Sequence, residues 1–283
     1  MELAFSKYEG AGNDFVAIDM TTSDVDVTSG HLKRMCSRKT GIGADGVLVL
    51  YGSSVPGCKF KLVYYNADGK EGSLCGNASR CSLAFAERIG LVGFQEQNHS
   101  IMLEACDGNH TGGKDSTGTY FIGIKDVTFA EVRKIDGSNY FLDNGSPHHI
   151  CFVSNLAQTD VYGRGKEIRW KVYGNEGANV NFVEASLETA DEISVRTFER
   201  GVEDETLACG TGATASAMAA FLRHQCSDGK AGGWEPVPPS ARTTRVLMKG
   251  GTLEVSFQEN TEAFFDVCLS GPVRHVFDGK ILL

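Results

Sequence analysis

Two stretches of the chain combine a polar loop, a cysteine followed by glycine, and a long run of small and apolar residues. The first run covers residues 78–89 and follows Cys75. The second run covers residues 213–222, follows Cys209 and contains no charged residue. A helix that is apolar on most of its faces has to be surrounded by other elements. The sequence therefore predicts two buried helices, each beginning beside a cysteine.

The two stretches occupy corresponding positions of an internal duplication. A shift of 134 residues carries Cys75 onto Cys209. The same shift aligns two further polar loops, 12–13 with 146–147 and 43–49 with 177–183. Three loops related by one shift indicate two halves of similar fold, although few of the aligned residues are identical. Two such halves facing each other would place the cysteines on opposite walls of one cleft, a common position for a ligand site.

Apolar alternation predicts strands along most of the chain. We expect strands at 3–8, 15–18, 47–50, 60–65, 100–106, 118–127, 139–142, 149–153 and 192–198, a Gly/Asp/Asn-rich turn between 106 and 118, and a hairpin at 246–255. Shorter helices are expected over 28–39, capped by Thr28 or Ser29, and from about Ser154. A Gly/Pro-rich loop should cover 227–242, and the first half should end near residue 126.

Charge and composition exclude several classes of function. The 27 Lys and Arg residues against 36 Asp and Glu residues give a net charge of −9, so we expect no nucleic acid partner. No apolar run approaches the ~18 residues of a membrane span, and no signal peptide opens the chain, so we expect a cytoplasmic protein. The nine cysteines lack Cys-x-x-Cys spacing, which favours reduced thiols and argues against a metal site.

Residues 41–46 match the G-x-G-x-x-G pattern of dinucleotide-binding proteins. That pattern requires a strand before it and a helix after it, because the pyrophosphate lies on the helix N-terminus. Here a polar basic segment precedes the glycines and a strand follows them. We therefore expect no nucleotide cofactor.

The two cysteines suit acid/base chemistry. Amide groups and the dipole at a helix N-terminus lower the pKa of a thiol from about 8.5 and favour the reactive thiolate. One thiolate and one thiol on opposite sides of a carbon can remove a proton and return another, which inverts a stereocentre without a pyridoxal cofactor. Nearby polar residues could bind a carboxylate and an ammonium group: Asn13, Asn66, Asn77, Asn179, Thr211 and the pair Glu199-Arg200.

Each of these residues also has a structural interpretation. A single buried cysteine at a helix start is more often structural than catalytic, and only the matching pair favours catalysis. His148 either packs in the core or tunes a thiol, and Glu199-Arg200 either binds substrate or forms a surface ion pair. The other seven cysteines are expected to be packing residues: Cys36, Cys58, Cys81, Cys106, Cys151, Cys226 and Cys268.

In their order and spacing, the motifs of this chain resemble the diaminopimelate epimerase family of cofactor-independent two-cysteine enzymes. The motifs are Gly12-Asn13-Asp14-Phe15, residues 41–46, Asn66-Ala67-Asp68-Gly69, Cys75-Gly76-Asn77, Gly145-Ser146-Pro147-His148, Asn179-Val180-Asn181-Phe182, Glu199-Arg200-Gly201 and residues 208–213. The resemblance implies an α+β (or α/β) fold of two pseudo-symmetric halves. Each half would be a curved, mostly antiparallel sheet around a central apolar helix, with the active site in the cleft between them. The C-terminal strand would return to the first half, giving half-domains 1–126 plus 271–283 and 127–270.

The resemblance also implies an activity and roles for residues. The activity is interconversion of LL- and meso-2,6-diaminopimelate, in lysine and peptidoglycan precursor biosynthesis, by a homodimer. Cys75 and Cys209 would be the acid/base pair, exchanging roles with reaction direction, and His148 would bias a thiol pKa. The carboxylate of the reacting centre would be held by Gly76, Asn77, Gly210 and Thr211. The remaining polar groups of the substrate would be bound by Asn13, Asn66, Asn179, Arg200 and Glu199, the last also counted as catalytic.

Two departures from the family pattern concern the pocket. Ala78-Ser79 replace a Gly-Ala that often follows Cys-Gly-Asn, and Ser146 replaces an asparagine that would contact the distal end of the substrate. They leave the strictness for the distal end open. A related racemase acting on proline, hydroxyproline or histidine is therefore an alternative, although Glu199-Arg200 and Asn179 favour a second zwitterionic end. A different class is a redox-sensing amino-acid-binding protein with a reversible disulfide between the two cysteines.

Overall fold

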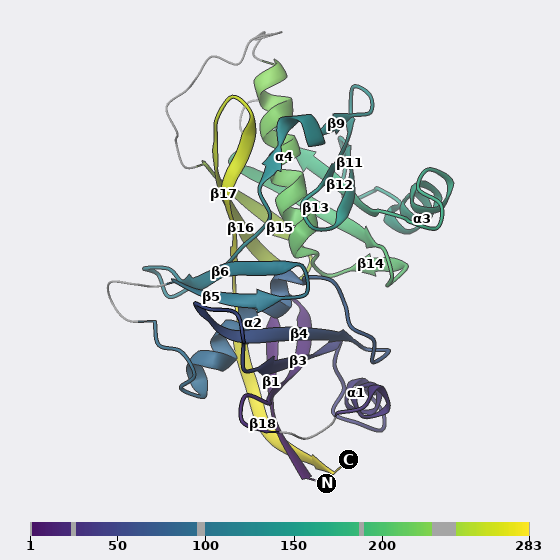
Figure 1. Cartoon of the computed structure of the whole chain (residues 1–283). Coiled ribbons are helices and arrows are strands. Elements are labelled where there is room, and N and C mark those ends of the chain that lie inside the picture. Colours follow the sequence, from purple (N-terminus) through teal and green to yellow (C-terminus); the bar gives the residue numbers. More distant parts are fainter. Residues whose placement is uncertain (1, 24–26, 95–99, 187–189, 228–241, 283) are drawn as a thin grey trace. The chain divides into compact units, whose positions relative to one another are not determined.

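The computed structural model of the chain describes residues 2–23, 27–94, 100–186, 190–227 and 242–282 (Figure 1). Nearly all of the loop expected over 227–242 lies outside the described residues. The chain divides into two compact units. Unit 1 comprises Met1–Gly123 with Ser270–Leu283, and unit 2 comprises Ile124–Leu269.

Unit 1 contains eight strands and two helices among its described residues. They are β1 (Glu2–Gly10), β2 (Asn13–Asp19), α1 (Ser29–Cys36), β3 (Gly46–Tyr51), β4 (Cys58–Asn66), α2 (Gly76–Arg88), β5 (Ser100–Ala105), β6 (Gly108–Lys114), β7 (Tyr120–Gly123) and β18 (Arg274–Leu282). Neighbouring strands are parallel at the two helical crossovers, β2-α1-β3 and β4-α2-β5, and antiparallel elsewhere. The C-terminal β18 pairs with β1 from Leu282 opposite Glu2 to Arg274 opposite Glu9, as the resemblance implies.

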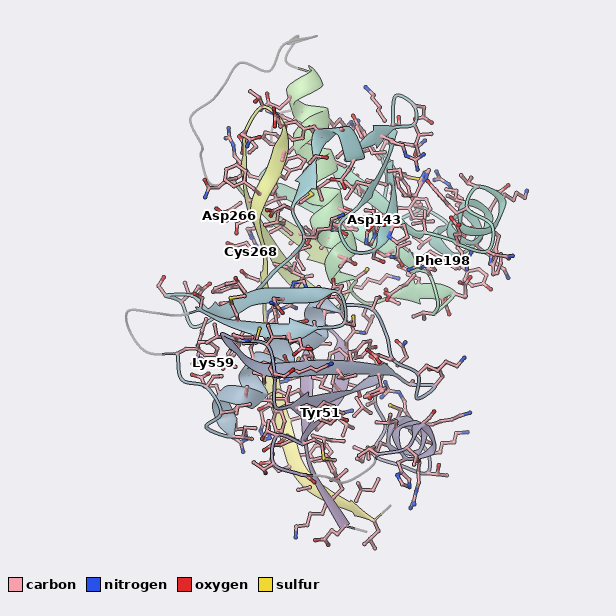
Figure 2. All side chains as sticks on the ribbon, viewed as in Figure 1. Tyr51, Lys59, Asp143, Phe198, Asp266 and Cys268 are labelled. Atoms are coloured by element: carbon pink, nitrogen blue, oxygen red, sulfur yellow. The ribbon has the colours of Figure 1, made fainter. Side chains whose placement is uncertain are left out.

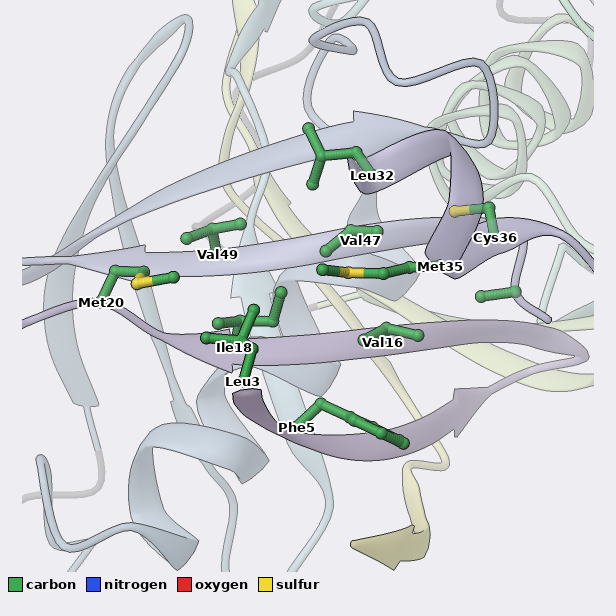
Figure 3. Close-up of a cluster of buried hydrophobic side chains, with 11 residues drawn as sticks. Leu3, Phe5, Val16, Ile18, Met20, Leu32, Met35, Cys36, Val47 and Val49 are labelled. Carbon is green, nitrogen blue, oxygen red and sulfur yellow. The ribbon is translucent and has the colours of Figure 1, made fainter. Parts of the chain in front are cut away.

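Strands β2 and β3 are buried on both faces. Helix α1 places Leu32 and Met35 over Val16 and Val47 in one apolar cluster (Figure 3). The alternate side chains of the strands are buried as well, and α2 packs against β1, β2 and β3. Burial on both faces explains why the sequence of β3 is a continuous apolar run rather than an alternation of apolar and polar residues.

Unit 2 repeats the plan of unit 1. Its elements are β8 (Val127–Thr128), the 3-10 turn η1 (Phe129–Glu131), β9 (Arg133–Lys134), β10 (Asn139–Asp143), β11 (Pro147–Phe152), α3 (Val161–Lys171), β12 (Asn179–Ala185), β13 (Glu192–Glu199), β14 (Asp204–Thr206), α4 (Gly210–Ser227), β15 (Arg242–Met248), β16 (Gly251–Glu259) and most of β17 (Ala263–Gly271). Parallel pairs again occur at two crossovers, β11-α3-β12 and β13-α4-β15.

The register of the strands confirms the duplication. In unit 1, Phe15 of β2 lies opposite Gly46 of β3. In unit 2, His149 of β11 lies opposite Val180 of β12, and both positions are shifted by 134 residues. The central helices α2 and α4 start the same distance apart, at Gly76 and Gly210. Both are buried along most of their length, so the two predicted buried helices and the pseudo-symmetric α+β fold are confirmed.

Two elements differ from the sequence-based expectations. The segment expected to be a turn between 106 and 118 contains β6, because its backbone pairs with β5 and β7 although its residues are poor strand formers. Helix α3 begins at Val161 rather than near Ser154. Arg196 binds the carbonyls of Leu156 at 2.9 Å and Thr159 at 3.1 Å, which holds the preceding segment in a non-helical path until Asp160 caps the helix.

The peripheral helices offer a matched pair of glycine substitutions. Gly165 of α3 is buried, and a Cβ there would lie 2.4 Å from the Cβ of Phe198 on β13 (Figure 2). Overpacking costs about 1–3 kcal/mol, which exceeds the gain of up to about 1 kcal/mol in helix propensity. Gly165→Ala should therefore lower the free energy of unfolding by about 1–2 kcal/mol, measured by urea denaturation followed by circular dichroism.

Gly30 of α1 supplies the control. It is exposed, and the nearest atom to a Cβ there would be Thr28 Oγ1 at 3.7 Å. Gly30→Ala should leave stability unchanged or raise it by up to about 1 kcal/mol. Equal effects of the two substitutions would contradict the packing assigned to α3.

Candidate active site

Cys75 is the residue that immediately precedes α2. Its backbone is extended (φ −113°, ψ 112°), and its carbonyl accepts a hydrogen bond from the Ser79 N–H at 2.8 Å. The cysteine is half-buried. N–H groups in the first turn of a helix have no partner within it and carry the positive end of the helix dipole. This position favours the thiolate form of Cys75.

The departure at Ala78-Ser79 lies within the helix itself. Both residues are fully buried. Ser79 Oγ donates to the Cys75 carbonyl at 3.0 Å, so the added hydroxyl supports the helix start. The serine therefore strengthens the backbone position of Cys75.

A line of side-chain amides leads away from the start of α2. Asn77 Nδ2 donates to Asn13 Oδ1 at 2.6 Å, and Asn13 Nδ2 donates to Asp45 Oδ2 at 3.2 Å. On its other side, Asn77 Oδ1 accepts from Arg80 Nη2 at 2.8 Å. The structure therefore joins two predicted binding residues, Asn13 and Asn77, and fixes the orientation of both amides.

Asp45 is held in turn by a charged cluster, Lys7, Asp14 and Arg38. Arg38 binds Asp14 through both terminal nitrogens, at 3.0 and 2.7 Å, and reaches Asp45 at 2.7 Å. Lys7 Nζ lies 2.7 Å from Asp14 Oδ2. Burial raises the pKa of Asp14, but hydrogen bonds from Arg38 and Lys7 outweigh it and lower the pKa to about 2. Asp14 is therefore ionised at neutral pH and keeps the cluster together.

Asn66, the last residue of β4, lies apart from this line. Its backbone N–H donates to the Lys70 carbonyl at 2.9 Å, and the residue is exposed. Among the described residues its side chain is not hydrogen-bonded to Asn13 or Asn77. Asn66 therefore presents an amide at the surface of unit 1.

Cys209 immediately precedes α4 and is the counterpart of Cys75. Its carbonyl accepts from the Ala213 N–H at 2.8 Å, and its Sγ lies 3.7 Å from Thr211 Oγ1. Unlike Cys75 it is buried, with 7% of its surface exposed. The fully buried Asn144 donates from Nδ2 to the Thr211 carbonyl at 2.9 Å. The predicted binding residues Gly210 and Thr211 therefore open a helix that Asn144 anchors.

Gly212 allows the first turn of α4 to approach the sheet closely. A Cβ there would lie 2.4 Å from Asn181 Oδ1 and 3.2 Å from Cys209 Sγ. Asn181 is fully buried, and its Oδ1 accepts from Thr197 Oγ1 at 2.9 Å. Asn181 and Cys209 therefore border the same small space beside α4.

His148, fully buried at the start of β11, is a neutral imidazole. Asn181 Nδ2 donates to the His149 carbonyl at 3.4 Å and lies 3.1 Å from His148 Nδ1, so Nδ1 is the acceptor and the proton is on Nε2. Burial, with the charge of Arg200 as a second cause, lowers the pKa of His148 to about 3. Nε2 is buried and has no hydrogen-bond partner among the described residues. The ring therefore offers one unused N–H donor.

Asn179 joins two loops of unit 2. Its Nδ2 donates to Ser146 Oγ at 3.1 Å, and its Oδ1 accepts the Arg200 N–H at 2.9 Å. Glu199 Oε2 accepts from Thr206 Oγ1 at 2.8 Å. The predicted binding residues Asn179, Glu199 and Arg200 are thus brought together at the end of β13, with Ser146 beside them.

The other cysteines differ from Cys75 and Cys209. Burial raises the pKa of Cys36 to about 11 and that of Cys151 to about 12, so both stay protonated. Five are buried or half-buried, as expected of packing residues: Cys36, Cys81, Cys151, Cys58 and Cys268. The expectation for Cys106 is wrong, because it lies in the turn between β5 and β6 and is exposed. The side chain of Cys226 lies outside the described residues.

Metal and membrane features were also sought in the described part of the chain. There, no three His, Cys, Asp or Glu side chains are grouped so that they could hold a metal ion. No helix among the described residues is long and apolar enough to cross a membrane.

Sequence reasoning missed four residues that hold this site: Arg80, Asn144, Asn181 and Asp45. Asn181 carried a usable signal, since a polar residue two positions from Asn179 in an apolar strand shares its buried face. Asp45 lies in the glycine-rich segment 41–46, where the spacing of the glycines drew attention to nucleotide binding instead. Arg80 and Asn144 are single polar residues whose burial the sequence does not reveal.

Several solved structures share this fold. A phenazine biosynthesis protein of the PhzF family from Bacillus anthracis matches with a TM-score of 0.68 at 15% identity, over 100% of both chains. A probable proline racemase from Agrobacterium radiobacter K84, with bound carbonate, matches with a TM-score of 0.66 at 13% identity, over 99% of this chain and 93% of its own. Identities this low show the fold alone.

The sequence matches more specific relatives. The family model described as diaminopimelate epimerase matches residues 5–110 and 140–276, and so includes both cysteines and their loops. A diaminopimelate epimerase from Flavobacterium psychrophilum is 38% identical over 277 residues, covering 97% of this chain and 98% of its own. One from Chlorobaculum tepidum is 39% identical over 280 residues, covering 97% and 99%. The chain belongs to the diaminopimelate epimerase family.

Proposed function

We propose that this protein is an isomerase that interconverts LL- and meso-2,6-diaminopimelate by two-base proton transfer at one α-carbon. Membership of the family supports the reaction and the substrate. The observation that carries the mechanism is that Cys75 and Cys209 occupy equivalent positions, each directly before a buried helix. Among the described cysteines, no other pair has this relation. We assign the two proton transfers to these thiols.

In the proposed reaction the thiolate of one cysteine takes the α-proton. The Cα–H bond breaks, an S–H bond forms, and the electron pair delocalises into the substrate carboxylate. The thiol of the other cysteine then gives its proton to the opposite face of Cα and becomes a thiolate. Backbone N–H groups of Gly76, Asn77, Gly210 and Thr211 would bind the carboxylate as its charge develops. The steps balance without a cofactor.

Other polar residues would bind the remaining groups of the substrate. The Glu199 carboxylate suits an ammonium group, and the Arg200 guanidinium suits a carboxylate. The amides of Asn13, Asn66 and Asn179 can serve either end. A substrate with two zwitterionic ends uses this combination of charged and amide partners better than one with an apolar ring.

We further propose that His148 acts as a neutral hydrogen-bond donor. Its low pKa keeps the ring uncharged at any pH near neutrality. A neutral ring adds no positive charge beside the thiols, but its Nε2–H can stabilise negative charge on the substrate or on a thiolate. In this role Asn181 fixes the tautomer from behind.

Proton exchange tests the reaction directly. The reduced protein, without added cofactor, should exchange the α-proton of LL-diaminopimelate with D₂O and form the meso isomer. Cys75→Ala and Cys209→Ala should each lower net epimerisation by about 10²–10⁴-fold, because each removes one of two proton carriers. Mass spectrometry measures the exchange, and chiral chromatography measures the inversion.

Cys58→Ala is the matched control, since Cys58 is half-buried on β4 and outside the proposed site. It should turn over as the wild type does. Proline, hydroxyproline and histidine should show no exchange. Full turnover in either catalytic variant, or exchange confined to one of these other amino acids, would refute the assignment.

Substitution of His148 distinguishes a donor from a base. His148→Gln keeps an N–H donor and should retain kcat/KM within about tenfold, whereas His148→Leu should lower it by about 10²-fold. The wild-type rate should show no titration near pH 6.5, because the ring is already neutral there. A step near that pH that disappears in His148→Gln would instead indicate a charged histidine.

We also propose that the protein is a cytoplasmic homodimer, as the family resemblance implies. Light scattering after gel filtration should give twice the chain mass of 30.5 kDa at micromolar concentration. A monomer that retains full activity would contradict the dimer and leave the proposed reaction intact.

A further inference from the structure

Arg80 is a cation buried in unit 1 behind the first turn of α2. It has no exposed surface. The guanidinium folds back toward the helix start, where Nη1 donates to the Gly76 carbonyl at 3.2 Å and Nη2 donates to Asn77 Oδ1 at 2.8 Å. These two acceptors belong to the residues that directly follow Cys75. The charge is therefore anchored within one helical turn of that cysteine.

The charge of Arg80 has no carboxylate partner within the described residues. Its electrostatic interactions there are with two thiols, Cys75 and Cys81, and its Nε is buried without a hydrogen-bond partner. Burial lowers the pKa of Arg80 to about 10, so the guanidinium remains protonated at neutral pH. Burying a cation without a counter-ion is unfavourable, and an adjacent thiolate would compensate it.

Of the two neighbouring thiols, only Cys75 can become that thiolate near neutral pH. Cys81 is fully buried, and burial holds its pKa well above the usual range in spite of Arg80. Cys75 is half-buried and lies at the helix N-terminus. The other charged or titratable groups around this helix start are Glu9 of β1, its partner Arg274 at 3.5 Å, and Cys106 after β5.

The equivalent helix of unit 2 carries a neutral residue in the same place. The shift of 134 residues relates Arg80 to Thr214, which is also fully buried. Thr214 Oγ1 donates to the Gly210 carbonyl at 3.1 Å, as Arg80 Nη1 does to Gly76. The same carbonyl in each half is therefore bound by a cation in one case and by a hydroxyl in the other.

We propose that Arg80 is a positioning residue that makes Cys75 the more acidic of the two catalytic thiols, so that the resting enzyme holds a Cys75 thiolate and a Cys209 thiol. The inference rests on the proposed two-base function and adds which base is deprotonated before substrate binds. Arg80 acts through its charge and through Asn77, whose amide it orients, without touching the substrate.

Site-resolved alkylation tests the proposal in the wild type. Iodoacetamide, applied over a series of pH values with a non-thiol reductant and no substrate, reports the thiolate fraction of each cysteine. Tryptic peptides 71–80 and 201–223 separate Cys75 from Cys209. The pH midpoint of Cys75 should lie below that of Cys209. A Cys209 midpoint at or below that of Cys75 would overturn the proposal, even if no variant of Arg80 folded.

Two substitutions then isolate the charge. Arg80→Gln removes it and keeps a donor, and should raise the Cys75 midpoint by about one pH unit while leaving that of Cys209 unchanged. Arg80→Lys keeps the charge and should restore the wild-type midpoint. Peptide fragmentation locates the label in Arg80→Gln, where the cleavage site is lost. An unshifted midpoint in folded Arg80→Gln, or no restoration by Arg80→Lys, would overturn the proposal.

Thr214→Val is the matched control in unit 2. It removes the equivalent hydrogen bond without changing charge, and should leave the Cys75 midpoint unchanged. The readout is independent of turnover. Predicted midpoints without α-proton exchange would contradict the epimerase proposal alone, whereas normal exchange with an unshifted Arg80→Gln midpoint would contradict the Arg80 proposal alone.

Discussion

The burial of α2 and α4 is the constraint on which the rest of the structure depends. Both helices are buried along most of their length, so neither has a solvated face on which polar residues could be placed. The first turn is then the one part of each helix with unsatisfied donors, and these N–H groups favour a negative charge. A cysteine directly before that turn gains a thiolate-stabilising position from the backbone alone. Repetition of the fold supplies it twice.

The two units surround this shared device with different chemistry. In unit 1 the amide of Asn13 leads to the ion pairs of Asp14 and Arg38, and Arg80 adds a buried charge on the other side. In unit 2 the corresponding supports are neutral, namely Asn144, Asn181 and an uncharged His148. Two-base catalysis needs one proton carrier loaded and one empty. A difference in charge between otherwise equivalent half-sites is a direct way to set that state.

Much of this arrangement could be predicted from the sequence, because it follows from patterns repeated at one shift. The buried helices, the positions of Cys75 and Cys209 and the duplicated crossovers all come from apolar periodicity and loop spacing. Strand β6 could not be predicted, because its glycine-rich sequence becomes a strand only through pairing with its neighbours. Asn144 was missed for a related reason, since its role depends on a carbonyl that is 67 residues away in the chain.

The departures from the family pattern can be interpreted in the same physical terms. Ser79 and Ser146 each replace a residue of different size, and both hydroxyls are engaged within the scaffold, on the Cys75 carbonyl and the Asn179 amide. Bonded in this way, they change how neighbouring site residues are held more than which groups those residues present. At Ser146 the hydroxyl takes up the amide of Asn179, whose carbonyl oxygen in turn fixes the backbone of Arg200. The serine at this position therefore acts on specificity through the placement of Arg200.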